Sequence, residues 1–513
     1  MAETPPPVER IESAFREKAS AAAPTHGETV GDEAERQRHR MLFHGIAWAA
    51  LARAITQGLS WASTMFVARI LTPRDYGLIG MSALYVGLVR LLSEFGLGSA
   101  ILALRSLGKS EIEQLNSFSI VFGVVGFGLT AAAARPLGLF FHAPALPAVV
   151  IASGLVSIIS SFRSMPLAIL QRDRRFKEIS TIEIGQGVVA IGTVIGFAIA
   201  GFGYWSLVLN EIAAATYAAV ATIQRSPVRF RWPRLRALSA ALKFSRDILI
   251  SRVSWYAYTN SDFLVAGRVL GEAALGVYSF AWTLTNLPIE KVTSVVMSVT
   301  PTFFSESQRD NEHLRSYLLI LTEGVAFLTF PIAVGVALTG SDFVPLVLGS
   351  KWAGAVAPLQ ILAFYTTVRS VTPFVSQALS MTGRVRHVMW NSVISALIFP
   401  PAFFVASHWN ASGIALAWVA LYPFVAWPLY RRLFLDIDLR TSTYVRALMP
   451  AMTGCAAMVV TVLTTHVAFE TVPPFARLAS EVTVGVATYG IVVLLMFRRR
   501  LENFLAIMRH EPS

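Results

Sequence analysis

Twelve ionisable side chains interrupt stretches of the chain that are otherwise apolar and long enough to cross a lipid bilayer. They are Arg53, Arg90, Glu94, Arg163, Glu183, Glu211, Arg252, Asp262, Glu290, Lys291, Glu323 and Arg369. An ionisable group inside the hydrocarbon costs about 2.5–3.5 kcal/mol on insertion scales, so each of them needs a partner or a function.

Four of these groups are cations suited to holding an anionic group inside the membrane. Arg53, Arg90, Arg252 and Lys291 are the candidates to bind such a group. A guanidinium stays charged and offers five N–H donors in a fixed geometry. The alternative is that these cations form salt bridges that fix helix packing, or that they extend to the interface.

Three carboxylates are candidates for gating or for coupling to an ion. They are Glu94, Asp262 and Glu290. Glu94 lies one helical turn after Arg90 and can simply pair with it, whereas Glu290 adjoins Lys291 and needs a separate partner. For Asp262, a structural role at the end of its helix is an equally good interpretation.

The elements that carry these residues are predicted to be transmembrane helices. About 20 apolar residues span a hydrocarbon core of ~30 Å, and about fourteen such stretches follow one another between residues 43 and 497. Only 14% of the residues are charged and the mean hydropathy is +0.57, which excludes an ordinary soluble domain. The chain is therefore predicted to be an all-α polytopic membrane protein.

Basic residues gather in alternate loops, which predicts the orientation of the chain. These groups are Arg36, Arg38 and Arg40; Arg105 and Lys109; Arg172, Arg174, Arg175 and Lys177; Arg225 to Arg236 with Lys243; Arg384 and Arg386; Arg431, Arg432 and Arg440; and Arg498 to Arg500. The other loops hold isolated charges such as Arg74 and Lys351. Both termini are thus predicted to be cytoplasmic, and the net charge of +12 reflects orientation and contact with anionic lipids rather than nucleic-acid binding.

Several classes of chemistry lack a sequence signal. Residues 1–40 hold no continuous apolar segment and are predicted to be a disordered cytoplasmic tail rather than a signal peptide. Cys455 is the single cysteine, so no disulfide forms within the chain. The histidines are scattered and no phosphate-binding Gly-Lys loop is present. We therefore predict no metal, no cofactor and no catalytic residues.

The two halves of the chain resemble each other weakly. Arg69-Ile-Leu71 followed by Gly77 recurs as Arg268-Val-Leu270 followed by Gly276. An even number of helices in each copy gives both copies the same orientation. This predicts a parallel repeat about an axis along the membrane normal, with a site between the halves. Chance similarity between apolar helices is the alternative.

At these same residues the chain resembles a known family. The segments that carry the resemblance are Val67-Ala-Arg-Ile-Leu-Thr-Pro-Arg-Asp-Tyr-Gly77, Gly96-Leu-Gly-Ser-Ala100, Gly203-Tyr-Trp-Ser-Leu-Val208, and Asn260 to Gly271 with Leu275-Gly-Val-Tyr278 and Leu287-Pro288. In order and spacing they resemble the polysaccharide transporter (Wzx-type) branch of the multidrug/oligosaccharidyl-lipid/polysaccharide exporter superfamily, over about residues 41–500.

The resemblance implies two six-helix lobes around a central cavity, two further C-terminal helices and alternating access. We expect an N-terminal lobe at 41–225, a basic cytoplasmic linker at 226–243, a C-terminal lobe at 244–435, the last two helices at 436–500 and a cytoplasmic tail at 501–513. It also implies a flippase, not an enzyme, that moves undecaprenyl-diphosphate-linked oligosaccharide across the bacterial inner membrane for surface polysaccharide. It further implies that Arg53, Arg90, Arg252 and Lys291 line one shared central cavity, where the four cations would hold the diphosphate.

Three alternatives stay open from the sequence. A peptidoglycan-precursor flippase fits the charges equally well, and a multidrug antiporter of the same superfamily fits the fold. An integral-membrane glycosyltransferase or polymerase would also use lipid-linked sugar, but such enzymes need a sizeable outer loop with paired carboxylates. Expected partners are the lipid-linked oligosaccharide and membrane lipids, with a polysaccharide polymerase and a chain-length regulator as further candidates.

Overall fold

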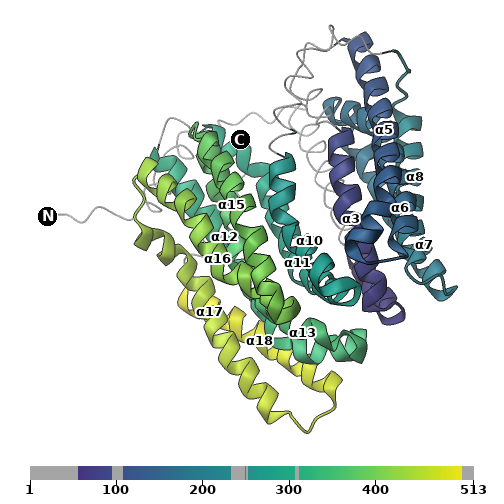
Figure 1. Ribbon diagram of the computed structural model, residues 1–513. Helices are drawn as coiled ribbons and strands as arrows, with labels where there is room; N and C mark the ends of the chain where they lie inside the picture. The colour runs from purple at the N-terminus through teal and green to yellow at the C-terminus, as the bar shows by residue number, and fades with distance from the viewer. Residues whose placement is uncertain (1–55, 95–107, 233–248, 250–251, 307–310, 499–513) are drawn as a thin grey trace, which may run out of the picture.

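The computed structural model describes residues 56–94, 108–232, 249, 252–306 and 311–498, and the regular structure within these residues is helical (Figure 1). They contain ten helical segments long and apolar enough to cross a membrane. One of these, Val385–Asp436, is 52 residues long and holds two helices, α15 and α16, that pack on each other. The all-helical membrane fold is confirmed, and the number fourteen stays a prediction.

The N-terminal lobe consists of the helical residues 56–70 and five further helices. These are α3 (Pro73–Glu94), α5 (Lys109–Phe141), α6 (Leu146–Arg172), α7 (Phe176–Ile199) and α8 (Trp205–Arg225). α6 packs against α3, α5 and α8, and α7 packs against α8. Tight turns at Gly201 and Gly203, which both have positive φ, join α7 to α8.

The C-terminal lobe begins with helical residues 252–259 and repeats this plan with irregular turns. It contains α10 (Ser261–Val265), η1 (Ala266–Leu270), α11 (Gly271–Glu306), α12 (Asn311–Phe343), η2 (Val344–Leu348), η3 (Ser350–Ala355), α13 (Val356–Arg369), α14 (Thr372–Met381), α15 (Val385–Ala406), η4 (Ser407–Trp409) and α16 (Asn410–Asp436). One of the fourteen predicted apolar stretches, at residues 354–381, is divided here, because the helix is interrupted between Arg369 and Thr372.

Two C-terminal helices, α17 (Thr441–Ala468) and α18 (Pro474–Met496), form an antiparallel pair beside the second lobe. Both contact α12, and they also pack on each other (Figure 1). The bundle therefore has two lobes and an added helix pair. The predicted domain boundaries stay predictions, and the tails at 1–40 and 501–513 and most of the linker at 226–243 lie outside the described residues.

The lobes meet through α3 and α11, and here the two copies of the sequence repeat touch. A Cβ built on Gly77 would overlap the carbonyl oxygen of Glu272, and one built on Gly276 would overlap the carbonyl oxygen of Pro73. Each glycine thus faces the backbone at the matching position of the other copy. Such close backbone approach, which small residues permit, is typical of packing between membrane helices. The reciprocal contact is the geometry that a parallel two-fold repeat requires.

Figure 1 shows the two lobes close together at the N-terminal ends of α3 and α11 and further apart toward the opposite end. We call the first the closed end; it is defined by Pro73, Phe141 and Gly271. We call the opposite end, where the lobes lie further apart, the basic end. It is defined by the ion pairs of Arg175 with Glu178 and of Arg384 with Asp436. The loops that the charge pattern assigns to opposite sides of the membrane thus lie at opposite ends of the helices.

Candidate functional site

A narrow pocket between the lobes forms the centre of the candidate site. Its volume is about 50 Å³, and its walls come from residues 56–70 and from α11. The lining residues are Gln57, Ser60, Trp61, Thr64, Met65, Thr283, Leu284 and Leu287. The lining includes hydroxyl, amide and indole groups, and we call this pocket the interlobe cleft.

Charged residues follow the interlobe cleft along α11 toward the basic end. Glu290 lies one turn beyond the cleft, and its Oε1 is 3.4 Å from Nη2 of Arg369. Arg369 Nη1 also donates to Asn286 Oδ1 at 2.6 Å, and its guanidinium lies over the ring of Trp282 at 5.7 Å. Lys291 is exposed on the same helix. Glu290 therefore has the separate partner that the sequence required.

Arg369 is one of the intramembrane charges to which the sequence analysis gave no role. Its side chain is 24% exposed and is held by Asn286, Glu290 and Trp282. It ends α13, at the interruption that replaces the predicted continuous helix. A charged residue inside an apolar span was a signal for a functional position, but only the fold brings it beside Glu290.

Arg90 and Arg252 lie where the second lobe crosses α3. Tyr256 donates from its hydroxyl to the carbonyl oxygens of Ala83 at 3.2 Å and Leu84 at 2.9 Å, which joins the lobes. Arg252 is exposed one turn before Tyr256, and Arg90 is exposed on α3, close enough for its charge to act on Tyr256.

Two of the predicted site residues cannot be placed fully. Arg53 lies outside the described residues, and Glu94 ends α3 with a side chain that is likewise outside them. The charge of Arg90 also acts on Glu211, an exposed carboxylate of α8, so α8 provides one acidic group near this cation. The shared cavity for Arg53, Arg90, Arg252 and Lys291 therefore stays a prediction.

Asp262 lies apart from these cations, inside the second lobe. Its side chain is 0% exposed, and its Oδ2 accepts hydrogen bonds from the Tyr278 hydroxyl at 2.6 Å and the Trp418 indole at 2.9 Å. Its Oδ1 accepts from the backbone N–H of Phe263 at 2.9 Å. Three neutral donors thus hold a buried carboxylate, an arrangement that joins α10, α11 and α16.

We expect Tyr278→Phe to destabilise the second lobe, because it removes a donor from a buried carboxylate. A hydrogen bond to a charged group contributes about 1.5–3 kcal/mol. The measurement is the thermal unfolding midpoint in detergent, with Tyr217→Phe as the control, since Tyr217 is 36% exposed. An unchanged midpoint combined with lost transport would instead assign Asp262 the gating or ion-coupling role.

The closed end is held by polar contacts between the two lobes. Arg74 pairs with Glu272, and Nη1 of Arg268 donates to the carbonyl oxygen of Phe140 at 2.6 Å. Lys351 Nζ donates to the carbonyl oxygen of Arg69 at 2.8 Å, and the Trp352 indole donates to that of Ala68 at 2.8 Å. Partial burial lowers the pKa of Lys351 below its usual value.

Aromatic packing adds to this closure. Tyr76 of α3 makes edge-to-face contacts with Phe280 and Trp352, each with a centroid distance of 5.3 Å. Trp352 and Phe280 are almost fully buried in a core cluster that contains residues of both lobes. A shallow hollow of about 460 Å³ between Arg74, His142 and Arg268 opens at the surface of this end. A solute in the interlobe cleft is thus separated from the closed end by packed side chains.

Comparison with known proteins agrees with this architecture. Residues 66–357 match a family described as polysaccharide biosynthesis protein. The lipopolysaccharide biosynthesis protein WzxC of Escherichia coli (strain K12) is 25% identical over 386 residues, which cover 73% of this chain and 77% of that protein. The succinoglycan biosynthesis transport protein ExoT of Rhizobium meliloti (strain 1021) is 23% identical over 485 residues, covering 90% and 95%.

A solved structure shares the fold over most of the chain. The lipid II flippase MurJ in an inward closed conformation superposes with a TM-score of 0.70, covering 89% of this chain and 100% of that chain, at 12% sequence identity. The two-lobe fold expected from the resemblance is therefore confirmed. Because the family match covers more than half of the sequence, the chain belongs to the polysaccharide biosynthesis protein family of multi-pass membrane proteins.

Proposed function

We propose that the protein is a flippase that moves a lipid-linked oligosaccharide across the bacterial inner membrane for surface polysaccharide synthesis. The relatives WzxC and ExoT are named for polysaccharide biosynthesis and transport, and the match to ExoT extends over almost its whole length. The observation that carries the proposal is the interlobe cleft, which is closed at one end and followed by cations toward the other.

The cleft supplies the two kinds of contact that such a substrate needs. Ser60, Thr64 and Thr283 line the cleft, and sugar hydroxyls would bind there once the lobes have moved apart, because the cleft is only about 50 Å³ in this state. Lys291, Arg252 and Arg90 lie further toward the basic end, where a diphosphate would replace its lost water with protein donors. The polyprenyl chain remains in the lipid while the head group passes between the lobes.

The closed end fits one state of an alternating-access cycle. We assign this end to the periplasm and the basic end to the cytoplasm from the distribution of arginines, which places both termini in the cytoplasm. Substrate enters from the basic end, and separation of α3 from α11 at Gly77 and Gly276 then opens the other end. No covalent step is required, so the protein acts as a transporter and not as an enzyme.

The retained alternatives differ in the chemistry of the cleft. A multidrug antiporter for cationic drugs would favour an acidic cleft, whereas the exposed carboxylates Glu211 and Glu290 are outnumbered here by the exposed cations Arg90, Arg252 and Lys291. A peptidoglycan-precursor flippase carries the same diphosphate and shares the fold with this chain, so only the sugar distinguishes it. A polymerase and a chain-length regulator are proposed partners, because they act on the oligosaccharide after it has crossed.

Reconstitution tests the proposed activity directly. Purified protein is incorporated into liposomes with undecaprenyl-diphosphate oligosaccharide in both leaflets, and an added membrane-impermeant glycosidase digests the outer pool. We expect wild-type protein to make the inner pool accessible within the assay time, while protein-free liposomes keep it protected. If the inner pool of lipid-linked oligosaccharide stays as protected from the glycosidase as it is in protein-free liposomes, the proposal is contradicted.

The membrane topology is tested by labelling single cysteines in a Cys455→Ala background. Lys351→Cys and Glu470→Cys should react with an impermeant thiol reagent added outside, because both positions are exposed in periplasmic loops of the proposed topology. Phe230→Cys, 53% exposed, should react only after the membrane is made permeable. External labelling at 230 without labelling at 351 would invert the assignment.

A further inference from the structure

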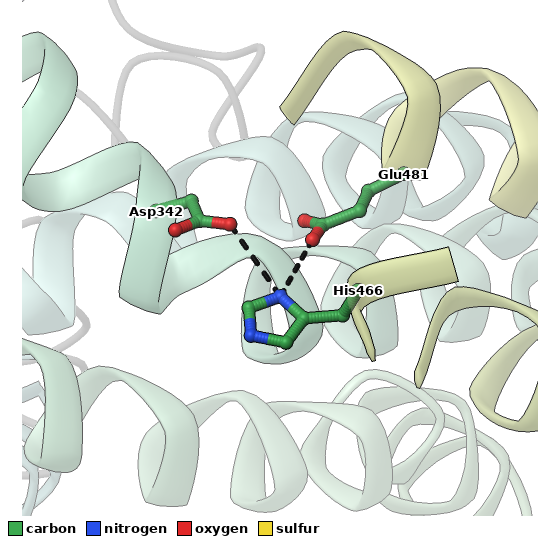
Figure 2. Close-up of side chains that lie close together, drawn as sticks. All are labelled: Asp342, His466 and Glu481. Atoms are coloured by element: carbon green, nitrogen blue, oxygen red, sulfur yellow. Dashed lines mark hydrogen bonds and ion pairs between the residues drawn. The ribbon is translucent and has the colours of Figure 1, made fainter. Parts of the chain in front are cut away.

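Four ionisable side chains from three helices meet near the closed end of the second lobe, away from the interlobe cleft. Asp342 lies in the last turn of α12, His466 lies in the last turn of α17, and Arg477 and Glu481 lie near the start of α18. Nδ1 of His466 is 2.7 Å from Glu481 Oε1 and 3.5 Å from Asp342 Oδ2 (Figure 2). The proposed transport cycle gives these residues no role.

One oxygen atom in this cluster has no hydrogen-bond partner. Glu481 is 1% exposed, and its Oε2 is buried without a partner among the described residues. An unpaired buried carboxylate oxygen is costly, so a ligand that binds it would be favoured. Figure 2 shows the carboxylates of Glu481 and Asp342 on the same side of the imidazole, where one ion could contact all three groups.

We propose that Asp342, His466 and Glu481 bind one divalent transition-metal ion with the preferences of Zn²⁺. Each residue offers one ligand atom, and the three atoms lie within 4.8 Å of one another. Zinc accepts imidazole nitrogen and carboxylate oxygen at about 2.0–2.2 Å, so side-chain shifts on the order of 1 Å would close the site. Asp342 and Glu481 carry two negative charges, one of which Arg477 already offsets, so the ion meets one net negative charge.

Arg477 orients one of these ligands. Its Nε donates to Asp342 Oδ2 at 2.8 Å, and its Nη2 donates to Oδ1 of the same carboxylate. A carboxylate has about four lone-pair positions, so two remain for the ion. Hydrogen-bonded partners of this kind commonly hold metal ligands in position. The side chain of His466 is 39% exposed, which leaves a path from solvent and space for a water as the fourth ligand.

The site would fasten the C-terminal helix pair to the second lobe. Its ligands come from α12, α17 and α18, and α18 reaches α12 through a limited contact along the helices. An ion that joins all three would fix the angle between the pair and the lobe. Without an ion, the cluster of Asp342, Glu481, Arg477 and a neutral His466 carries one net negative charge. A single proton is therefore the ligand that competes with the metal ion. The experiment below distinguishes proton binding from metal binding.

The test measures metal binding to the full-length protein in detergent, purified with an affinity tag that lacks histidine. The chain is stripped with a chelator, and Zn²⁺ binding is measured by equilibrium dialysis while Co²⁺ binding is followed by its visible absorption. We expect one ion per chain. Glu481→Gln should weaken the affinity more than about tenfold, since even an indirect partner of a metal costs 10- to 100-fold.

Two matched variants serve as controls. Glu470→Gln removes an exposed carboxylate from the same α17–α18 connection, and His408→Gln removes an exposed imidazole near the closed end. Both should bind Zn²⁺ like the wild type. Unfolding midpoints in chelator show whether Glu481→Gln is folded, and Zn²⁺ should raise the midpoint of the wild type but not of this variant.

Three results would overturn the proposal. These are no stoichiometric binding to the wild type, equal binding to Glu481→Gln, or a pH-dependent stabilisation by the cluster that Zn²⁺ does not alter. The last would identify a proton site. The metal-binding measurement involves no transport assay. Its result therefore does not depend on whether the protein is a flippase.

Discussion

Export of polysaccharide is expected to cease when Arg252 is replaced by alanine, while the protein remains in the membrane. A diphosphate cannot keep its hydration shell between the lobes, so protein donors must replace the water. Arg252 is exposed on the segment that crosses α3. Loss of a buried charge contact costs about 2–5 kcal/mol, which is roughly 30- to several-thousand-fold in binding. Arg252→Lys should be intermediate, because it keeps the charge but loses the planar fork.

The measurement is surface polysaccharide in a strain that lacks the chromosomal copy, with membrane protein quantified in parallel. Arg386→Ala is the control, because Arg386 is an exposed arginine at the basic end outside the interlobe cleft. Normal export by Arg252→Ala at matched abundance would exclude a role for Arg252 in anion binding. Equal loss of export and of protein would show that Arg252 is structural.

Gly276→Ala is expected to keep the closed end from closing and so to stop transport. The added Cβ would overlap the carbonyl oxygen of Pro73, and α3 and α11 would have to separate. Because the repeat makes the contact reciprocal, Gly77→Ala should have the same effect through Glu272. Both effects should be large, since backbone atoms cannot move aside as side-chain ends can.

Labelling detects this opening even when export is zero. Thr283→Cys in the interlobe cleft, in a Cys455→Ala background, should react with an external thiol reagent faster when Gly276→Ala is added. The control is Gly128→Ala, because a Cβ at Gly128 meets nothing within 4 Å. Unchanged labelling with normal export would show that this contact does not control access.

Much of the fold could be predicted, because only helices and closed β-barrels can cross a bilayer with all their backbone hydrogen bonds formed. Apolar length identifies helices, and alternate arginine-rich loops assign their ends. The match of Arg69–Gly77 with Arg268–Gly276 predicted the repeat, but only the structure shows that the two matched segments touch. The interruption between Arg369 and Thr372 was missed, although Pro373 at the start of α14 lacks the N–H that a continuous helix would need.

The site could be predicted only in part, because burial and pairing depend on tertiary contacts. Asp262 was identified as an unusual charge, but sequence spacing could not show that Tyr278 and Trp418 enclose it. Asp342, His466 and Glu481 lie far apart along the chain, so scattered histidines gave no sign that they meet. Lys291 and Arg252 were found from their charge alone, since a cation in an apolar helix is rare.

The most direct test of the proposed transport is the location of the lipid-linked intermediate in a strain from which this chain has been deleted. The proposal predicts that undecaprenyl-diphosphate oligosaccharide accumulates in the cytoplasmic leaflet, that surface polysaccharide is lost, and that wild-type protein restores both. An impermeant glycan-oxidising reagent applied to spheroplasts, and to inverted vesicles, reports the leaflet. Accumulation in the periplasmic leaflet would instead indicate a polymerase, and accumulation of peptidoglycan precursor would indicate the other flippase; either result would contradict the assigned function.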